Sequence, residues 1–129
     1  MGHGTDITVR RVYDVLKEEA EPRGRVFLVD AMWPRGVRKA DLRVDDWLKG
    51  AAPSRELRTW FGHDPERWPQ FCERYRAELG EHSDDLRPLE RAAAEGPVTL
   101  LYSARDEHRN NAVVLADYLK ERLTASRGA

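Results

Sequence analysis

The chain has little cysteine, almost no net charge and no long hydrophobic run. Its single cysteine, Cys72, cannot form an internal disulfide, which favours a reducing compartment. The formal net charge is -1, so no overall positive potential attracts nucleic acid or an acidic membrane surface. No apolar stretch approaches the roughly 20 residues that span a bilayer, and no signal-peptide core opens the chain. We therefore expect a cytoplasmic protein that has no membrane segment.

Familiar cofactor motifs are also missing. The sequence contains neither a glycine-rich dinucleotide loop nor a P-loop, so nicotinamide and ATP sites of the usual kinds are not predicted. The histidines lack the spacing of a zinc finger or a zinc protease, so no metal is predicted either. The pattern leaves the identity of any cofactor open.

The residues that are present alternate between strand and helix patterns. Hydrophobic residues make up 40% of the chain and recur periodically, which indicates a folded domain. Because strand signals are separated by helical ones, we predict a single small α/β domain, a mainly parallel sheet flanked by helices. Its ordered core is expected over about residues 7–123, with flexible termini. Strands are predicted in residues 6–14, 25–30 and 97–104, a loop or frayed turn in 15–24, and either a helix or a third strand in 44–53.

Capping residues predict where the helices of the crossover region, residues 54–95, begin and end. Ser54 is expected to cap one helix that Gly62 ends. Asp64 is expected to cap the next helix, with its regular part starting near Pro69 because proline disrupts a helix interior. Pro88 is expected to bend or delay the following helix. A last helix is predicted over residues 106–123.

The stretch "FLVDAMWPRGVRK", residues 27–39, places a rigid turn directly after a buried strand. Pro34 fixes the backbone, Gly36 lets it turn, and Trp33 anchors it. Arg35 is thereby held at the end of the strand, where ligands of parallel α/β sheets tend to bind. Arginine pairs with phosphate or carboxylate through two parallel hydrogen bonds. Either Arg35 binds such an anion, or it forms an internal ion pair with Asp30 or Asp106.

Polar residues follow the other clear strand and would face the same cleft if the two strands are neighbours. Asp30 and Asp106 are the candidate catalytic residues, which would orient Arg35 or move a proton, and Asp106 could also cap the last helix. The candidate substrate-binding residues are Trp33, Arg35, Tyr102, Ser103, Arg105 and Asn111.

Two functional hypotheses follow from these residues. The first is a cleft at the carboxyl ends of the strands that binds or acts on a small phosphorylated or carboxylated metabolite. The alternative is a non-catalytic interaction or regulatory module, acting on a protein partner or as a homo-oligomer, with an apolar patch around Trp60, Phe61 and Trp68. Nucleic-acid binding is not expected, since it would need one basic stripe of Arg10, Arg11, Arg35, Arg38 and Lys39.

Several blocks occur in an order that resembles the bacterial domain-of-unknown-function 488 family: "LVDAMWPRGV", "WLKGAAPSRELRTWFGHDPERW", "FCERYRAEL" and "GPVTLLYSARD". The resemblance covers about residues 7–120. It implies a small cytosolic α/β domain and supplies no reaction. The chain departs from the family pattern at Ala31 and Met32, where members commonly carry arginine and leucine, and at Arg109, where members often carry histidine.

Overall fold

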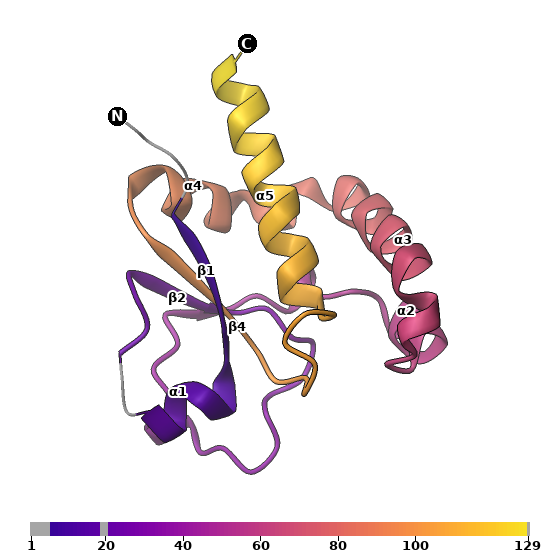
Figure 1. The fold of residues 1–129 in the computed structure, drawn as a ribbon. Coiled ribbons are helices and arrows are strands. Elements are labelled where there is room, and N and C mark those ends of the chain that lie inside the picture. The colour runs from indigo at the N-terminus through magenta and orange to yellow at the C-terminus, as the bar shows by residue number, and fades with distance from the viewer. Residues whose placement is uncertain (1–5, 19–20, 129) are drawn as a thin grey trace.

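Four short parallel strands form the centre of the structure, a computed structural model that describes residues 6–18 and 21–128, with side chains to Thr124 (Figure 1). The strands pair in the order β1-β4-β2-β3, so β4 and β2 are the inner ones. This arrangement confirms the predicted α/β domain with a parallel sheet and the inner position of the segment around Phe27. The strands are β1 (Ile7–Arg11), β2 (Arg25–Leu28), β3 (Asp46–Trp47) and β4 (Val98–Tyr102).

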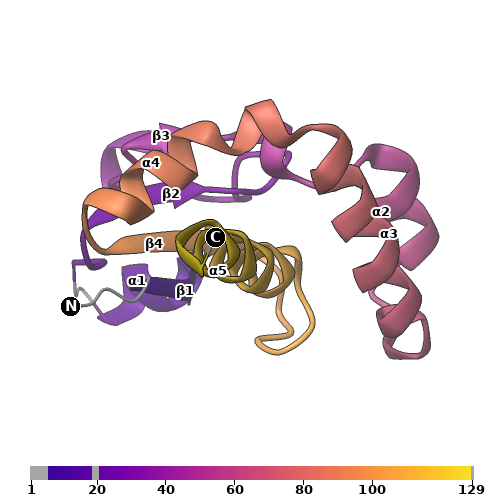
Figure 2. The same ribbon diagram turned by 90° about the horizontal axis from the view of Figure 1, so that it is seen from above.

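Helices cover both faces of this sheet. The longest, α5, lies along the sheet next to β1 and β4, with α2 and α3 beyond it (Figure 2). The opposite face is covered by α1 and by the long segment between β2 and β3. The α-helices are α1 (Val12–Glu18), α2 (Arg55–Phe61), α3 (Trp68–Glu81), α4 (Arg87–Glu95) and α5 (Asn111–Gly128). Short 3₁₀ turns occur at η1 (Lys39–Asp41), η2 (Lys49–Ala51), η3 (Pro65–Arg67) and η4 (Ser83–Leu86).

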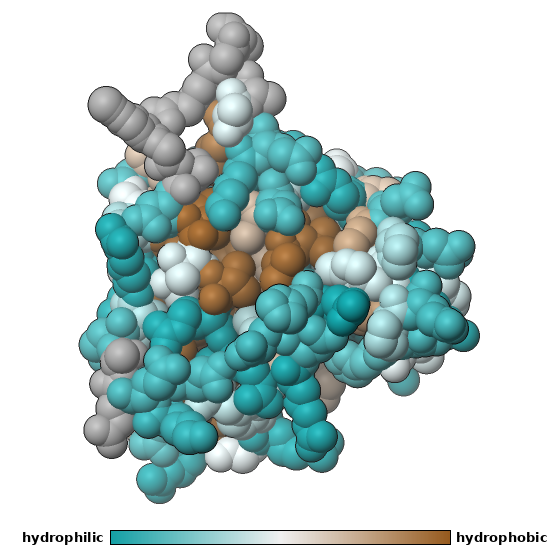
Figure 3. All heavy atoms as spheres, in the orientation of Figure 1, coloured by the Kyte–Doolittle hydropathy of each residue, from teal (hydrophilic) through white to brown (hydrophobic). Residues whose placement is uncertain are grey.

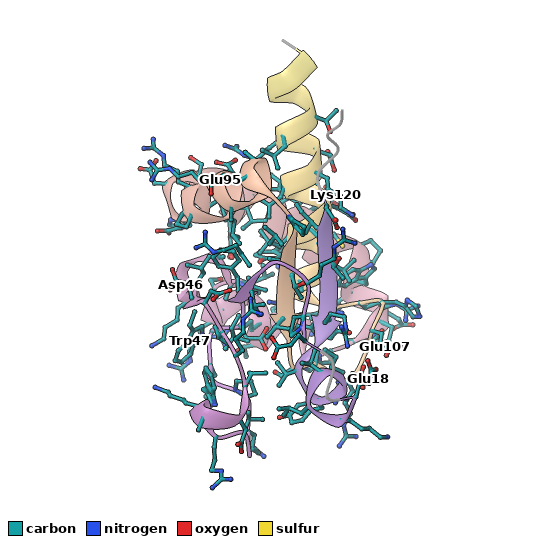
Figure 4. The ribbon with its side chains drawn as sticks, turned by 90° about the vertical axis from the view of Figure 1, so that its left-hand side faces the viewer. Glu18, Asp46, Trp47, Glu95, Glu107 and Lys120 are labelled. Carbon is teal, nitrogen blue, oxygen red and sulfur yellow. The ribbon has the colours of Figure 1, made fainter. Side chains whose placement is uncertain are left out.

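The inner strands are buried because their side chains alternate between two hydrophobic clusters. Phe27 and Val29 face the larger cluster under α2 to α5, whereas Val26 and Leu28 face the smaller one under α1. All five residues of β4 are buried, as expected for a parallel strand that is covered on both sides. Figure 4 shows the two edges of the sheet, with Asp46 and Trp47 of β3 on one side and Glu18, after β1, on the other.

The predicted helix boundaries in the crossover region are confirmed. The Ser54 hydroxyl accepts a hydrogen bond from the Leu57 N–H at 3.1 Å, and Gly62 ends α2 in the left-handed conformation with φ 51°. The Asp64 side chain caps η3, and α3 begins at Trp68, one residue before Pro69.

Three local predictions need correction. The predicted loop over residues 15–24 overlaps α1, because Val12 and Val15 share one buried helix face although the charged residues after them mask the pattern. The predicted strand over residues 6–14 ends at Arg11, where α1 follows. The stretch 44–53 needs no correction, because the third strand, one of its two alternatives, forms as β3 and a 3₁₀ turn follows it. The last helix begins at Asn111, and Asp106 does not cap it. Instead, the side-chain oxygen of Asn110 accepts from the Val113 N–H at 3.0 Å.

The ends of the chain test the remaining expectations only in part. Helix α5 runs to Gly128, past the predicted core limit at residue 123, while residues 1–5 and 129 lie outside the described ones. In the described part of the chain, no helix is long and apolar enough to cross a bilayer. Figure 3 shows hydrophobic residues gathered over α5 and β1, above a mostly hydrophilic region where the strands end.

Candidate functional site

A cleft of about 490 Å³ opens at the carboxyl ends of β2 and β4, a size that suits a small metabolite. Three parts of the chain build it: the loop after β2, the loop between β4 and α5, and the α2–α3 region. The first loop supplies Asp30 to Arg35, the second supplies Ser103, Ala104 and residues 109–111, and the third supplies Pro53, Arg58, Phe61, His63 and Phe71; Tyr13 also lines the cleft.

Three side chains hold the backbone of the loop after β2 by donating hydrogen bonds to its carbonyl groups. Trp47 Nε1 donates to the Asp30 carbonyl at 2.8 Å, and Trp33 Nε1 donates to the Val37 carbonyl at 2.7 Å. The Tyr13 hydroxyl donates to the Arg35 carbonyl at 2.7 Å. The two indoles also meet edge to face, with ring centroids 5.6 Å apart. These hydrogen bonds fix the backbone of the loop after β2, as its sequence predicts.

The Arg35 side chain itself extends from this loop into solvent. Within residues 6–18 and 21–128, its guanidinium has neither a hydrogen-bond partner nor an ion pair, so the internal pairing with Asp30 or Asp106 is absent. Gly36 follows with φ 78°, in the left-handed region that favours glycine. Arg35 thus lines the cleft with its guanidinium unpaired among the described residues.

Asp30 is bound by the polar residues that sequence reasoning placed beside it. Its Oδ2 accepts from the Ser103 N–H at 2.9 Å and from the Ser103 hydroxyl at 2.7 Å. Its Oδ1 accepts from Asn111 Nδ2 at 3.1 Å, and the same amide donates to the Val29 carbonyl at 2.9 Å. Asn111 reaches this position because α5 begins there, directly over the end of β2.

Burial raises the pKa of Asp30 above its ordinary value. The hydrogen bonds from Ser103 and Asn111 and the positive charge of Arg58 act in the opposite direction, because each stabilises the carboxylate. Burial is the largest influence, so the net shift of the Asp30 pKa is upward. The three donors favour the ionised form as a fixed acceptor inside the cleft.

Arginines dominate the charged lining. Among the described lining residues, Arg35, Arg58 and Arg109 oppose Asp30 alone, which gives +3 and -1, or a formal +2 with His63 neutral. Arg58 is half-buried and uses its Nε to donate to the Pro53 carbonyl at 3.3 Å. Arg109 is partly offset by an ion pair at 3.4 Å with a carboxylate outside the cleft. The described lining therefore carries a net positive formal charge.

The structure brings five of the eight predicted site residues to the cleft and leaves three outside it. The five are Asp30, Trp33, Arg35, Ser103 and Asn111. Tyr102 is buried in the core, at 3% exposure, and Arg105 is exposed beyond the cleft. The Asp106 carboxylate accepts from the backbone N–H groups of His108 and Arg109, which lowers its pKa. It shapes the loop before α5 and lies outside the lining.

Sequence reasoning missed the wall formed by α2 and α3. Arg58, Phe61 and Phe71 line the cleft, and the Phe61 and Phe71 rings stack with centroids 4.4 Å apart. The available signal was the helix that Ser54 caps, since a helix that follows a strand starts at the edge where the strands end. His63, the residue after the glycine that ends α2, also lines the cleft, at φ 58°.

The other two hypotheses find less support in the geometry. Phe61 is buried, and Trp60 and Trp68 are half-buried, so these rings do not form an open apolar patch. Two arginines of the proposed basic stripe are offset by acids, through the pairs Arg10–Glu18 and Arg38–Asp41. In the described part of the chain, no group of three or more histidine, cysteine, aspartate or glutamate side chains could hold a metal ion.

Comparison with known proteins identifies the family. Residues 6–129 match the family described as "Inactive DUF488-N3 subclade". The chain belongs to the DUF488 family. It is 42% identical over 115 residues to the uncharacterized protein YeaO of Escherichia coli K12, covering 89% of this chain and 97% of that protein. The uncharacterized protein Rv3073c of Mycobacterium tuberculosis H37Rv is also 42% identical, over 119 residues, 92% of this chain and 97% of that protein. No solved structure matches.

The three positions that the sequence analysis contrasted with the resembled family lie together in this DUF488 chain. Ala31, Met32 and Arg109 all line the cleft. Met32 is 70% exposed there.

Proposed function

We propose that this chain binds a small phosphorylated or carboxylated metabolite in the cleft at the carboxyl ends of β2 and β4. The observation that carries the proposal is Arg35, a guanidinium that is fixed at its backbone, lines the cleft and has no partner among the described residues. Arg58 and Arg109 add positive charge to the same lining, and Asp30 is the acid that opposes them. A guanidinium pairs well with phosphate or carboxylate.

The proposal is for binding, without turnover. The matching subclade is described as inactive, and the positions that depart from the family pattern line the cleft. Asp106, the second candidate acid, lies outside the lining and has a lowered pKa, so it is a poor proton acceptor near neutral pH. Asp30 is then the one carboxyl group among the described lining residues.

Titration calorimetry with phosphate esters and carboxylates, on the wild type and on Arg35→Ala, tests the proposal. Removing one charge-assisted hydrogen-bonding group should weaken binding by about 1.5–3 kcal/mol, roughly tenfold to a hundredfold. Because the Arg35 side chain is exposed and free of internal partners, the free energy of unfolding should change by no more than about 0.5 kcal/mol.

Arg38→Ala is the matched control. Arg38 lies in the same segment and is exposed, but it pairs with Asp41 outside the cleft. Equal weakening in both variants would mean that only general surface charge attracts the anion. The absence of saturable binding by every ester and carboxylate, or a much less stable Arg35→Ala, would refute the proposal.

A further inference from the structure

Charge is divided across the cleft between an inner acid and outer cations. Asp30 lies at the sheet, held between the end of β4 and the start of α5. Arg35 and Arg109 are exposed lining residues, whereas Arg58 is half-buried and its charge acts on Asp30. No ion pair between Asp30 and these arginines occurs in the described part of the chain. A ligand that fills the cleft would therefore contact a carboxylate in one part and guanidinium groups in another.

The hydrogen bonds of Asp30 leave one acceptor position open. An ionised carboxylate offers about four acceptor positions, two on each oxygen. On Oδ2 both are taken, by the N–H and the hydroxyl of Ser103, and on Oδ1 one is taken, by Asn111. The remaining position is on Oδ1 of a side chain that lines the cleft. A ligand that excludes water from this oxygen without donating to it would leave the acceptor unsatisfied, which is costly.

We infer that the ligand of this cleft is an anion that carries an uncharged hydroxyl at its other end, as hydroxy acids and polyol phosphates do. The inference rests on the proposed anion binding. The anionic group pairs with Arg35 and its neighbouring arginines, and the hydroxyl donates to Asp30 Oδ1. The short body between the two ends passes the rings of Trp33, Phe61 and Phe71.

The donor is a hydroxyl, as opposed to an ammonium group, because of the overall charge of the lining. The lining is formally +2 and Arg58 already stabilises the negative charge of Asp30. A second cation near Asp30 would be repelled by that arginine, whereas a hydroxyl donates its proton without adding charge. A hydroxyl can also accept a hydrogen bond at the same time, which an ammonium group cannot.

Three phosphate esters that differ only at their far end test the inference: propyl phosphate, 3-hydroxypropyl phosphate and 3-aminopropyl phosphate. The series is repeated with the two-carbon and four-carbon analogues, so that the distance between the ends is covered. Calorimetry should show that, in at least one length, the hydroxyl ester binds about tenfold more tightly than the alkyl ester, as one hydrogen bond to a charged group provides. It should also bind more tightly than the amino ester.

Asp30→Asn should abolish the preference for the hydroxyl ester and keep binding of the alkyl ester. Asp117→Asn is the control that should keep the preference, because Asp117 is an exposed aspartate of α5 outside the cleft. Circular dichroism verifies that both variants fold. If Asp30→Asn does not fold, the binding series on the wild type alone decides the question.

The possible failures are distinguishable. If no ester binds, the anion-binding proposal is wrong. If all three esters of every length bind equally, anion binding stands and the inference about the hydroxyl is overturned. A preference for the amino ester also overturns it, because Asp30 would then recognise a cation.

Discussion

Replacing Asn111 with alanine tests how the cleft is held together. Its side-chain amide makes two hydrogen bonds, to the Val29 carbonyl and to the Asp30 carboxylate. A neutral hydrogen bond contributes about 1 kcal/mol and one to a charged group about 1.5–3 kcal/mol. Asn111→Ala should therefore destabilise the protein by about 3 kcal/mol, which lowers the Tm by roughly 10 °C in a domain of this size.

The same substitution should change how stability depends on pH. Burial raises the pKa of Asp30 in the folded state, so this group's stabilising contribution is full below its unfolded pKa and is lost as the pH rises through the folded pKa. Asn111→Ala removes a donor that favours the carboxylate, so the folded pKa rises further and the loss at neutral pH becomes larger. The destabilisation should be about 1 kcal/mol greater at neutral pH than in acid, where the neutral carboxyl needs the donor less.

Val114→Ala provides the matched control on the same helix. Val114 is 4% exposed, and deleting its two methyl groups should cost about 2 kcal/mol at any pH, because no titrating group is involved. Urea unfolding of both variants and the wild type at a series of pH values measures the difference. The same pH dependence in both variants, or a loss below about 1 kcal/mol for Asn111→Ala, would refute the account of Asp30 as a buried carboxylate held by this amide.

Two further changes test the scaffold. Gly24 has φ 68°, and a Cβ there would collide with the Pro97 carbonyl, whereas Gly36 has φ 78° with nothing within 4 Å of a Cβ. Gly24→Ala should thus cost several kcal/mol in urea unfolding and Gly36→Ala only about 1 kcal/mol, and equal losses would contradict this difference. Ser54→Ala removes the cap of α2 and a hydrogen bond to Glu78, so it should cost about 1–2 kcal/mol by thermal unfolding, and no measurable loss would contradict the capping role.

The elements that sequence reasoning predicted well are those whose signals are local. The apolar runs around Phe27 and Leu100 became the inner strands, because a strand covered on both faces has no polar side. Ser54, Gly62 and Pro69 mark helix ends through the geometry of their own backbone and side chains, so no distant contact was needed to place them.

The elements that were missed or left open depend on distant contacts. The two residues of β3 form a strand only because β2 offers them hydrogen-bonding partners, and a run this short carries no periodicity. Helix α1 is stabilised by Val12 and Val15, which pack on β2 and β4 residues far along the chain. Asn110 replaced Asp106 as the helix cap because Asp106 binds the loop backbone that precedes the helix.

The candidate site likewise contains residues that local signals could place and residues whose positions depend on distant contacts. The rule that ligands bind at the carboxyl ends of parallel strands was enough to group Asp30 with Ser103 and Asn111, since β2 and β4 are direct neighbours. The same rule could not place Arg58, because its position depends on how α2 packs against α3. Nor could it tell that Tyr102, the last residue of β4, turns into the core.

The separation of Arg35 from Asp30 is the feature that most needs a physical reason. Ser103 and Asn111 satisfy Asp30 on the inner side, while Tyr13 holds the Arg35 backbone so that its side chain extends outward. An internal ion pair would have neutralised both groups, and a purely structural role would favour that pairing. A fold that keeps an acid and a cation apart in one cleft leaves both groups available to a ligand. Charged groups that are not paired with each other in this way are expected at functional sites. In the proposed function, the unpaired Arg35 and the separate Asp30 are the groups that a ligand with complementary groups at its two ends would contact.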